Sequence, residues 1–200
     1  MLLDVQDSQL VLVDYQAKLM PALHEGDAVL RNAVRLAQMA QLLKVPTWGT
    51  EQNPDRLGPN PADLRDLCRR TLPKMAFSAC EEGLIDCLRP QAAAPAGNAR
   101  SLPRHLQKAV PAAATRNTVV ISGCEAHVCL LQTALGLLEE EFDVWVVTDA
   151  CASRTERNRD AAFDRLASAG AELLTTEMVA FEWLGSAEHP QFKAVQALIK

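Results

Sequence analysis

The sequence predicts an α/β fold in which a mainly parallel, Rossmann-like β-sheet lies between two layers of helices. Short and nearly continuous apolar runs alternate along the chain with longer segments whose apolar residues recur at helical spacing. Continuous apolar strands are typical of a sheet that is buried on both faces. The chain has 200 residues, of which 48% are hydrophobic and 22% charged. This length and composition predict one domain, over residues 1–200, with a full core.

Strands and helices are expected to follow one another in a regular order. The apolar runs predict strands at 9–14, 45–51, 117–123, 143–150 and 171–176. Helical spacing predicts helices at 27–44, from about residue 129 onward, at 156–170 and at 190–200. Frequent Pro and Gly predict loops at 52–64 and 86–103. Strands that alternate with helices imply right-handed crossovers between parallel neighbours.

Composition and charge exclude several classes of function. The net charge is −5, which argues against nucleic acid or an anionic membrane as the main partner. The sequence has no basic, apolar leader and no apolar run long enough to cross a bilayer, so we expect a cytoplasmic protein. The six cysteines lack paired C-x-x-C spacing, which predicts free thiols and no structural zinc site.

Chemically reactive residues follow the ends of the predicted strands. Asp14 ends the first strand, Thr50 and Glu51 end the second, and Cys129 opens the helix behind the strand at 117–123. Lys74 lies in a connection that leads back into the sheet. Ligands bind at the carboxyl ends of parallel strands. The order of elements therefore predicts that an acid, a lysine and a cysteine meet at one rim.

These three residue types together suit nucleophilic catalysis. A thiolate attacks carbonyl carbon, and a helix start or a nearby lysine lowers the pKa of a cysteine. Asp14 would take the thiol proton and later deliver it to a leaving amine. Free N–H groups in the turn GCEAHVC would bind the oxyanion, a contact worth about 2.7–4 kcal/mol.

Purely structural interpretations of the same residues remain open at this point. Cys129 also fits a small buried apolar residue before a helix. Asp14 also fits a cap of the turn after a strand, and Lys74 a solvated surface charge. His127 fits a base, a structural residue or part of the wall of a substrate pocket.

Five segments, which together cover almost the whole chain, resemble the isochorismatase-like cysteine hydrolases, most of all the branch of isochorismatase domain-containing proteins. The segments are LVLVDYQ, TEQNPDRLGP, PKMAFSAC, SGCEAHVCLLQTALGLLEEEFDVWVVTDACASR and MVAFEWLGSAEHPQFKAVQALIK. The resemblance implies a catalytic triad of Asp14, Lys74 and Cys129. It also implies a cis peptide bond between Cys124 and Glu125, and an oxyanion hole formed by the N–H groups of Glu125 and Cys129.

The sequence also departs from other branches of that family. The nicotinamidase branch holds a metal with an aspartate and two histidines after the second strand, whereas TEQNPDRLGPNPADL contains no histidine. We therefore expect no metal and no cofactor. Isochorismatases that cleave a vinyl ether need no cysteine at the nucleophile position, so Cys129 favours acyl chemistry.

The sequence thus favours a cysteine-dependent hydrolase of a small amide, or of a related C–N or ester bond, that acts through a thioester. Candidate pocket residues are Glu51, Gln52, Phe77 and His127. The alternatives are a binding or thiol redox-sensing protein on the same fold and a vinyl ether hydrolase. We expect a small-molecule substrate and a homo-oligomer, a dimer or larger, with the aromatic residues of FEWLG buried between subunits.

Overall fold

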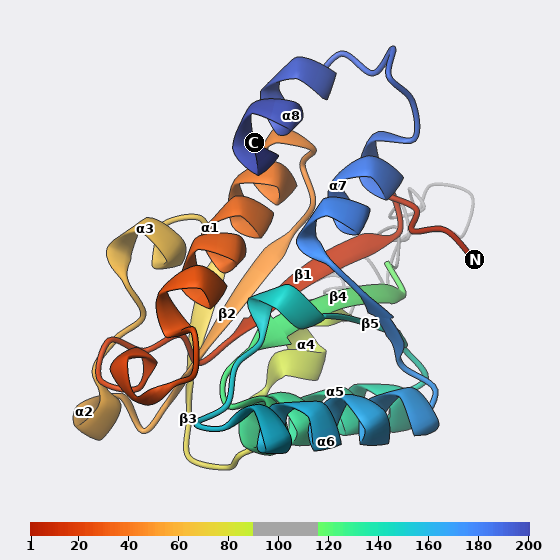
Figure 1. Cartoon of the computed structure of the whole chain (residues 1–200). Coiled ribbons are helices and arrows are strands. Elements are labelled where there is room, and N and C mark those ends of the chain that lie inside the picture. Colours follow the sequence, from red (N-terminus) through yellow and green to blue (C-terminus); the bar gives the residue numbers. More distant parts are fainter. Residues whose placement is uncertain (90–115) are drawn as a thin grey trace, which may run out of the picture.

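The elements of the protein surround one parallel sheet in the computed structural model, which describes residues 1–89 and 116–200 (Figure 1). Within these residues the sheet has six strands in the order β3-β2-β1-β4-β5-β6. Every neighbouring pair is parallel. The strands are β1 (Ser8–Val13), β2 (Thr47–Gln52), β3 (Arg70–Lys74), β4 (Thr118–Gly123), β5 (Asp143–Val147) and β6 (Glu172–Leu174). The strand order reverses between β1 and β4, which is where open α/β sheets bind ligands.

Two layers of helices cover the sheet, as the sequence predicts (Figure 1). One face packs against α1 (Gly26–Leu42) and α7 (Thr176–Leu184), and α8 (Phe192–Ile199) packs against these two helices. The other face packs against α4 (Leu84–Leu88), α5 (Leu131–Glu139) and α6 (Glu156–Ser168). The shorter elements are α2 (Pro54–Leu57), α3 (Ala62–Arg65), the 3₁₀ turns η1 (Met20–Ala22), η2 (Cys80–Glu82) and η6 (Thr148–Ala150), and the π-helical turn η5 (Ala126–Leu130).

The burial of strand β1 explains why most of its sequence is apolar. All six of its residues are buried. Leu10 and Leu12 belong to the core on the α1 side, whereas Val11 and Val13 belong to the core on the α5 side. Successive side chains of a strand point to opposite faces. A strand buried on both faces therefore has apolar residues at successive positions, here from Leu10 to Val13, and its carboxyl end reaches the rim from inside the core.

Two expectations from the sequence are wrong in the region between β2 and α4. Lys74 is the last residue of β3 and does not lie in a connecting segment. Because β3 is an edge strand, it tolerates Pro73 and exposed charges, and its sequence lacks an apolar run. The stretch 52–64, expected to be a loop, contains helix α2 and most of helix α3. Helix α2 begins at Pro54, since proline is favourable in the first helical turn.

Helix α7 is an element that the sequence analysis does not predict. The Thr175 hydroxyl accepts the N–H of Met178 and caps its start. Trp183 is buried within the chain, where its Nε1 donates to Ser8 Oγ at 3.0 Å, so its predicted place between subunits is wrong. Phe181 stays 44% exposed. The predicted loop at 86–103 begins within α4, and its residues from 90 onward lie outside the described residues.

Among the described helices, none combines the length and apolar character that crossing a membrane requires.

Candidate active site

Asp14 lies immediately after β1, at the centre of the sheet. Its backbone has φ 53°, a left-handed conformation that aspartate adopts more readily than most residues. Its N–H donates to Thr50 O at 3.2 Å, and Thr50 Oγ1 donates to its Oδ1 at 2.6 Å. The Asp14 side chain is fully buried. Strand β2 therefore fixes the carboxylate and occupies one of its two oxygens.

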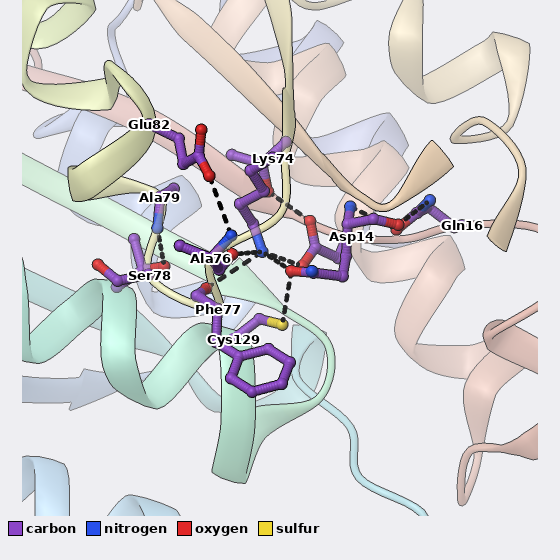
Figure 2. Close-up of polar contacts among 12 residues, drawn as sticks. Asp14, Gln16, Lys74, Ala76, Phe77, Ser78, Ala79, Glu82 and Cys129 are labelled. Carbon is purple, nitrogen blue, oxygen red and sulfur yellow. Dashed lines mark hydrogen bonds and ion pairs between the residues drawn. The ribbon is translucent and has the colours of Figure 1, made fainter. Parts of the chain in front are cut away.

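Lys74 reaches this carboxylate from the edge strand. Its Nζ lies 2.8 Å from Asp14 Oδ2, and both side chains are 0% exposed. The ammonium also donates to Gln52 Oε1 at 2.6 Å and to Phe77 O at 3.1 Å. Figure 2 shows Asp14, Lys74 and Cys129 gathered at one point of the rim. The structure thus places all three predicted catalytic residues together.

Cys129 lies within η5, and its side chain is mostly buried. The helix was expected to start near Cys129, but it begins at Ala126 as a π-helical turn, and α5 continues it from Leu131. Such π turns are frequent at functional sites. Cys129 is 6% exposed, and its Sγ lies 3.7 Å from Gln52 Oε1. Gln52 therefore contacts both the thiol and the lysine.

The turn between β4 and η5 comes unusually close to β1. The Cys124–Glu125 peptide bond in this turn is cis. Gly123 has φ 152°, and a Cβ at this position would lie 2.3 Å from Val13 O and 2.8 Å from Val13 Cα. Only glycine permits this approach. The glycine thus lets the turn that leads to Cys129 pack directly against the strand that ends at Asp14.

The surroundings of Cys129 raise the pKa of its thiol to about 12. Burial is the largest cause, because it removes the solvation of a thiolate. The negative charge of Asp14 acts in the same direction, and Lys74 acts against both. Lys74 therefore lowers this pKa as expected, but the expected net lowering is wrong because burial and Asp14 outweigh the lysine. The resting thiol is protonated at neutral pH, and a reaction at sulfur needs a base.

Several backbone N–H groups of the turn are already occupied. The Ala126 N–H donates to Ala152 O at 2.7 Å, and the N–H groups of Val128 and Leu130 donate to Glu125 O at 3.0 and 3.3 Å. Within the described residues, neither the Glu125 N–H nor the Cys129 N–H donates to an acceptor outside η5. The Glu125 N–H, which precedes η5, is thus open to a ligand oxygen. The resemblance assigns this group and the Cys129 N–H to an oxyanion hole.

The other candidate pocket residues divide into two groups. Gln52 and Phe77 contact the Lys74 ammonium, and the Phe77 side chain is 52% exposed beside it. Glu51 Oε1 instead accepts the N–H of Asn60 at 2.8 Å. His127 Nδ1 lies 2.9 Å from Ser153 Oγ. These last two residues hold neighbouring loops.

Two further polar residues of the site were not singled out as candidates from the sequence. Thr50 donates to Asp14. Gln16 is fully buried and pairs with the backbone of Gln52, accepting its N–H at 2.8 Å and donating to its carbonyl at 3.0 Å. Both residues lie at or just after the carboxyl end of a strand, and that position was the available signal.

No cluster of three or more His, Cys, Asp or Glu side chains among residues 1–89 and 116–200 has the arrangement of a metal site.

Comparison with known proteins gives consistent matches over nearly the whole chain. The model of the isochorismatase domain matches residues 8–178. Isochorismatase domain-containing protein 2 of Bos taurus is 35% identical over 193 residues, which cover 96% of this chain and 83% of that protein. A structure described as MAR1 ribonuclease from Caenorhabditis elegans has a TM-score of 0.83 at 31% identity, covering 100% of this chain and 92% of that one.

Two structures of YcaC share the fold as well. The Escherichia coli protein, described as an octameric hydrolase of unknown specificity, has a TM-score of 0.81 at 27% identity, covering 98% of this chain and 88% of that one. The Pseudomonas aeruginosa protein, solved with hexane-2,5-diol and covalent acrylamide, has a TM-score of 0.78 at 26% identity, covering 98% of this chain and 91% of that one. The fold, the extent of the domain match and these relatives together establish that the chain belongs to the isochorismatase family.

Proposed function

We propose that this protein is a cysteine hydrolase of a small amide, or of a related C–N or ester bond. The observation that carries the proposal is the buried ion pair of Asp14 and Lys74 beside the Cys129 thiol. A thiol with a raised pKa is a poor nucleophile unless a base takes its proton during attack. The Asp14 carboxylate is the charged base in contact with that thiol.

In the first half of the reaction the Cys129 sulfur attacks the substrate carbonyl carbon while its proton passes to Asp14. The carbonyl oxygen becomes an oxyanion held by the N–H groups of Glu125 and Cys129. When the tetrahedral intermediate collapses, the C–N bond breaks and the Asp14 proton goes to the leaving nitrogen. The products of this half are a free amine and a thioester on Cys129.

In the second half, water attacks the thioester carbonyl and gives a proton to Asp14. The C–S bond then breaks, the acid leaves, and the proton returns to sulfur. Lys74 takes no part in these proton transfers. It pairs with the Asp14 carboxylate and stabilises the sulfur when it carries negative charge.

Findings on relatives support this assignment. The E. coli relative is described as a hydrolase, and the P. aeruginosa relative was solved with covalent acrylamide. Acrylamide is a small amide that alkylates nucleophiles, so it suits the proposed site. The C. elegans relative is described as a ribonuclease. The net charge of −5 supports a small-molecule substrate over RNA, and we include RNA as an arm of the test.

The experiment measures release of amine from a panel of small amides, and of alcohol from matched esters, by the wild-type protein and four variants. Cys129→Ala removes the nucleophile, Asp14→Asn the base and Lys74→Met the cation. Cys80→Ser serves as the control, because it removes a partly exposed thiol that has no role in the proposed mechanism. We expect turnover in the wild type and in Cys80→Ser, and a loss of at least about a hundredfold in the other three.

Three results would overturn the proposal. Turnover that survives Cys129→Ala would exclude the thiol mechanism. Hydrolysis of RNA but of no amide or ester would favour a nuclease. Oxidation of Cys129 by peroxide with no turnover of any substrate would favour the redox-sensing alternative.

The proposal includes a homo-oligomer in the cytoplasm. The E. coli relative is octameric. In this chain, Met178 and Phe181 lie one helical turn apart on α7 and are 47% and 44% exposed. Phe181 also lines a hollow of about 400 Å³ together with Leu184 and Phe192. Exposed apolar residues beside a hollow are typical of a subunit contact.

A further inference from the structure

The loop that follows β3 wraps around the Lys74 ammonium. Lys74 Nζ donates to Phe77 O at 3.1 Å and lies 3.4 Å from Ala76 O. The side chains of this loop point largely to solvent, since Met75 is 66% and Phe77 52% exposed. Burial of side chains therefore contributes little to its conformation, which depends on hydrogen bonds.

Glu82 supplies two of those hydrogen bonds from η2. Its Oε1 accepts the backbone N–H of Met75 at 3.1 Å and that of Ala76 at 3.0 Å. Figure 2 shows Glu82 bonded to the Ala76 N–H, while the lysine side of the same loop is bonded to the ammonium. The loop is thus held from both sides, by a carboxylate on its N–H groups and by a lysine on its carbonyl groups.

The charge of Glu82 strengthens this contact. Hydrogen bonds from a backbone N–H to a carboxylate are shorter and stronger than those to a neutral oxygen. The bonds from Ala76 and Met75 hold the pKa of Glu82 below its usual value, so the side chain is ionised at neutral pH. Gln52 adds a third hydrogen bond to the loop, since its Nε2 donates to Met75 O at 2.8 Å.

We propose that Glu82 is a positioning residue for the hydrolytic site, which it serves by keeping the loop closed on Lys74. Glu82 touches no reacting atom. It holds the N–H groups of Met75 and Ala76, and the same loop presents the carbonyl groups of Ala76 and Phe77 to Lys74. The ammonium is thereby held beside Asp14 and Cys129. This inference rests on the proposed function, because it assigns Glu82 a part in the same reaction.

The test compares Glu82→Ala and Glu82→Gln with Glu81→Ala as the matched control. Glu81 is an exposed acid on the same 3₁₀ turn, so its removal changes the charge equally without touching the loop. Three quantities are measured on the full chain: hydrogen exchange of the Met75 and Ala76 amides, the rate constant for alkylation of Cys129 by acrylamide, and the melting temperature.

We expect Glu82→Ala to accelerate exchange of the two amides at least about tenfold and to slow alkylation of Cys129 about fivefold to tenfold. Glu82→Gln keeps an oxygen at the same place and should recover most of both effects. Glu81→Ala should match the wild type in amide exchange and in alkylation rate. The melting temperature should change by the same small amount in Glu82→Ala and Glu81→Ala, which separates positioning from a general loss of stability.

Equal alkylation rates in Glu82→Ala and Glu81→Ala would overturn the inference, and so would unchanged amide exchange in Glu82→Ala. If the proposed function itself is wrong, the experiment gives a different result. In that case wild-type Cys129 forms no adduct and no substrate turns over, while amide exchange still reports whether Glu82 holds the loop.

Discussion

Asp14 and Lys74 form an ion pair from which water is excluded. Removing two charges from water costs several kcal/mol per ion, and attraction between them offsets this cost only when further hydrogen bonds complete the geometry. Thr50 and Gln52 supply those bonds here. A charge pair of this kind contributes little to stability, so its place beside a thiol is better explained by chemistry.

Breaking the pair from either side should destabilise the fold. Asp14→Asn and Lys74→Met each leave one buried charge without its partner, so each should lower the free energy of unfolding by about 3–5 kcal/mol. In the double variant no charge remains, and its loss should be clearly smaller than the sum of the single losses. Urea denaturation of the four proteins measures this coupling. Strictly additive losses would show that the two groups do not interact.

Thr50 offers a more delicate test of how Asp14 is held. Thr50→Val keeps the shape of the side chain but removes the hydroxyl that donates to Asp14 Oδ1. A hydrogen bond to a charged group is worth about 1.5–3 kcal/mol, so we expect kcat/KM to fall about tenfold or more. Thr50→Ser retains the hydroxyl and serves as the control. Equal activity of the two variants would rule out this role of Thr50.

That the candidate site residues lie close together could be predicted from the sequence better than the pKa of the Cys129 thiol. Asp14 and Cys129 follow buried strands, and the rim of a parallel sheet brings such positions together. The direction of the Cys129 pKa could not be predicted in this way, because it depends on how much water and negative charge surround the sulfur. Contacts such as Gln16 with Gln52 depend likewise on tertiary packing.

The close contact between the ends of β1 and β4 is the arrangement of elements that the site requires most. It rests on Gly123, where an added Cβ would meet the Val13 backbone. This contact brings the turn that carries Glu125 and leads to Cys129 up to Asp14. Any residue larger than glycine would push the two strand ends apart.

Two glycine substitutions test whether the close contact between β1 and β4 requires glycine at position 123. Gly123→Ala should lower the free energy of unfolding by about 3 kcal/mol, since it adds a steric clash to an unfavourable φ. Gly170 also has positive φ, 102°, but nothing lies within 4 Å of its added Cβ. Gly170→Ala should therefore cost only about 1–2 kcal/mol. Thermal or urea unfolding compares them, and equal losses would contradict the close approach.

Elements buried on both faces were predicted well, and those at the edge were not. Strands β1 and β4 each contain a run of apolar residues, and α1 and α6 show clear helical periodicity. The edge strand β3 contains Pro73 and charged residues, so its pattern is that of a loop. The π-helical start of η5 has no pattern of its own, because it depends on how the chain leaves β4 against neighbouring segments.

Buried thiols give the whole molecule a characteristic response to alkaline pH. Burial raises the pKa of Cys68, Cys129 and Cys151 to about 12 and that of Cys80 to about 11, from an ordinary value of 9.0. Above pH 9 the unfolded chain loses these protons while the folded chain keeps them. Stability therefore falls as pH rises, because the unfolded state binds fewer protons.

We expect the free energy of unfolding to depend little on these thiols below about pH 9 and to fall progressively above it. The Cys129→Ala variant should lose stability less steeply between pH 9 and pH 11, since one of the contributing thiols is gone. Urea denaturation over this range tests the expectation. An identical slope in wild type and variant would show that Cys129 ionises equally in both states.

The state of assembly can be tested through Phe181. We expect the wild type to elute as a dimer or a larger oligomer in size-exclusion chromatography with light scattering. Phe181→Glu places a charge in the proposed contact and should yield a smaller species with an unchanged far-UV circular dichroism spectrum. Glu177→Gln, an exposed position on the same helix, is the control. A monomeric wild type would refute the proposed oligomer.

The central claim is that a protonated Cys129 becomes a nucleophile when Asp14 takes its proton. Rapid quenching of the protein with an activated small ester, followed by peptide mapping, tests it most directly. The account predicts a hydroxylamine-sensitive acyl group on Cys129 in the wild type, formed at least about a hundredfold more slowly in Asp14→Asn. An acyl group that forms on Cys129 at the same rate in both proteins, or that forms only on other residues, would contradict it.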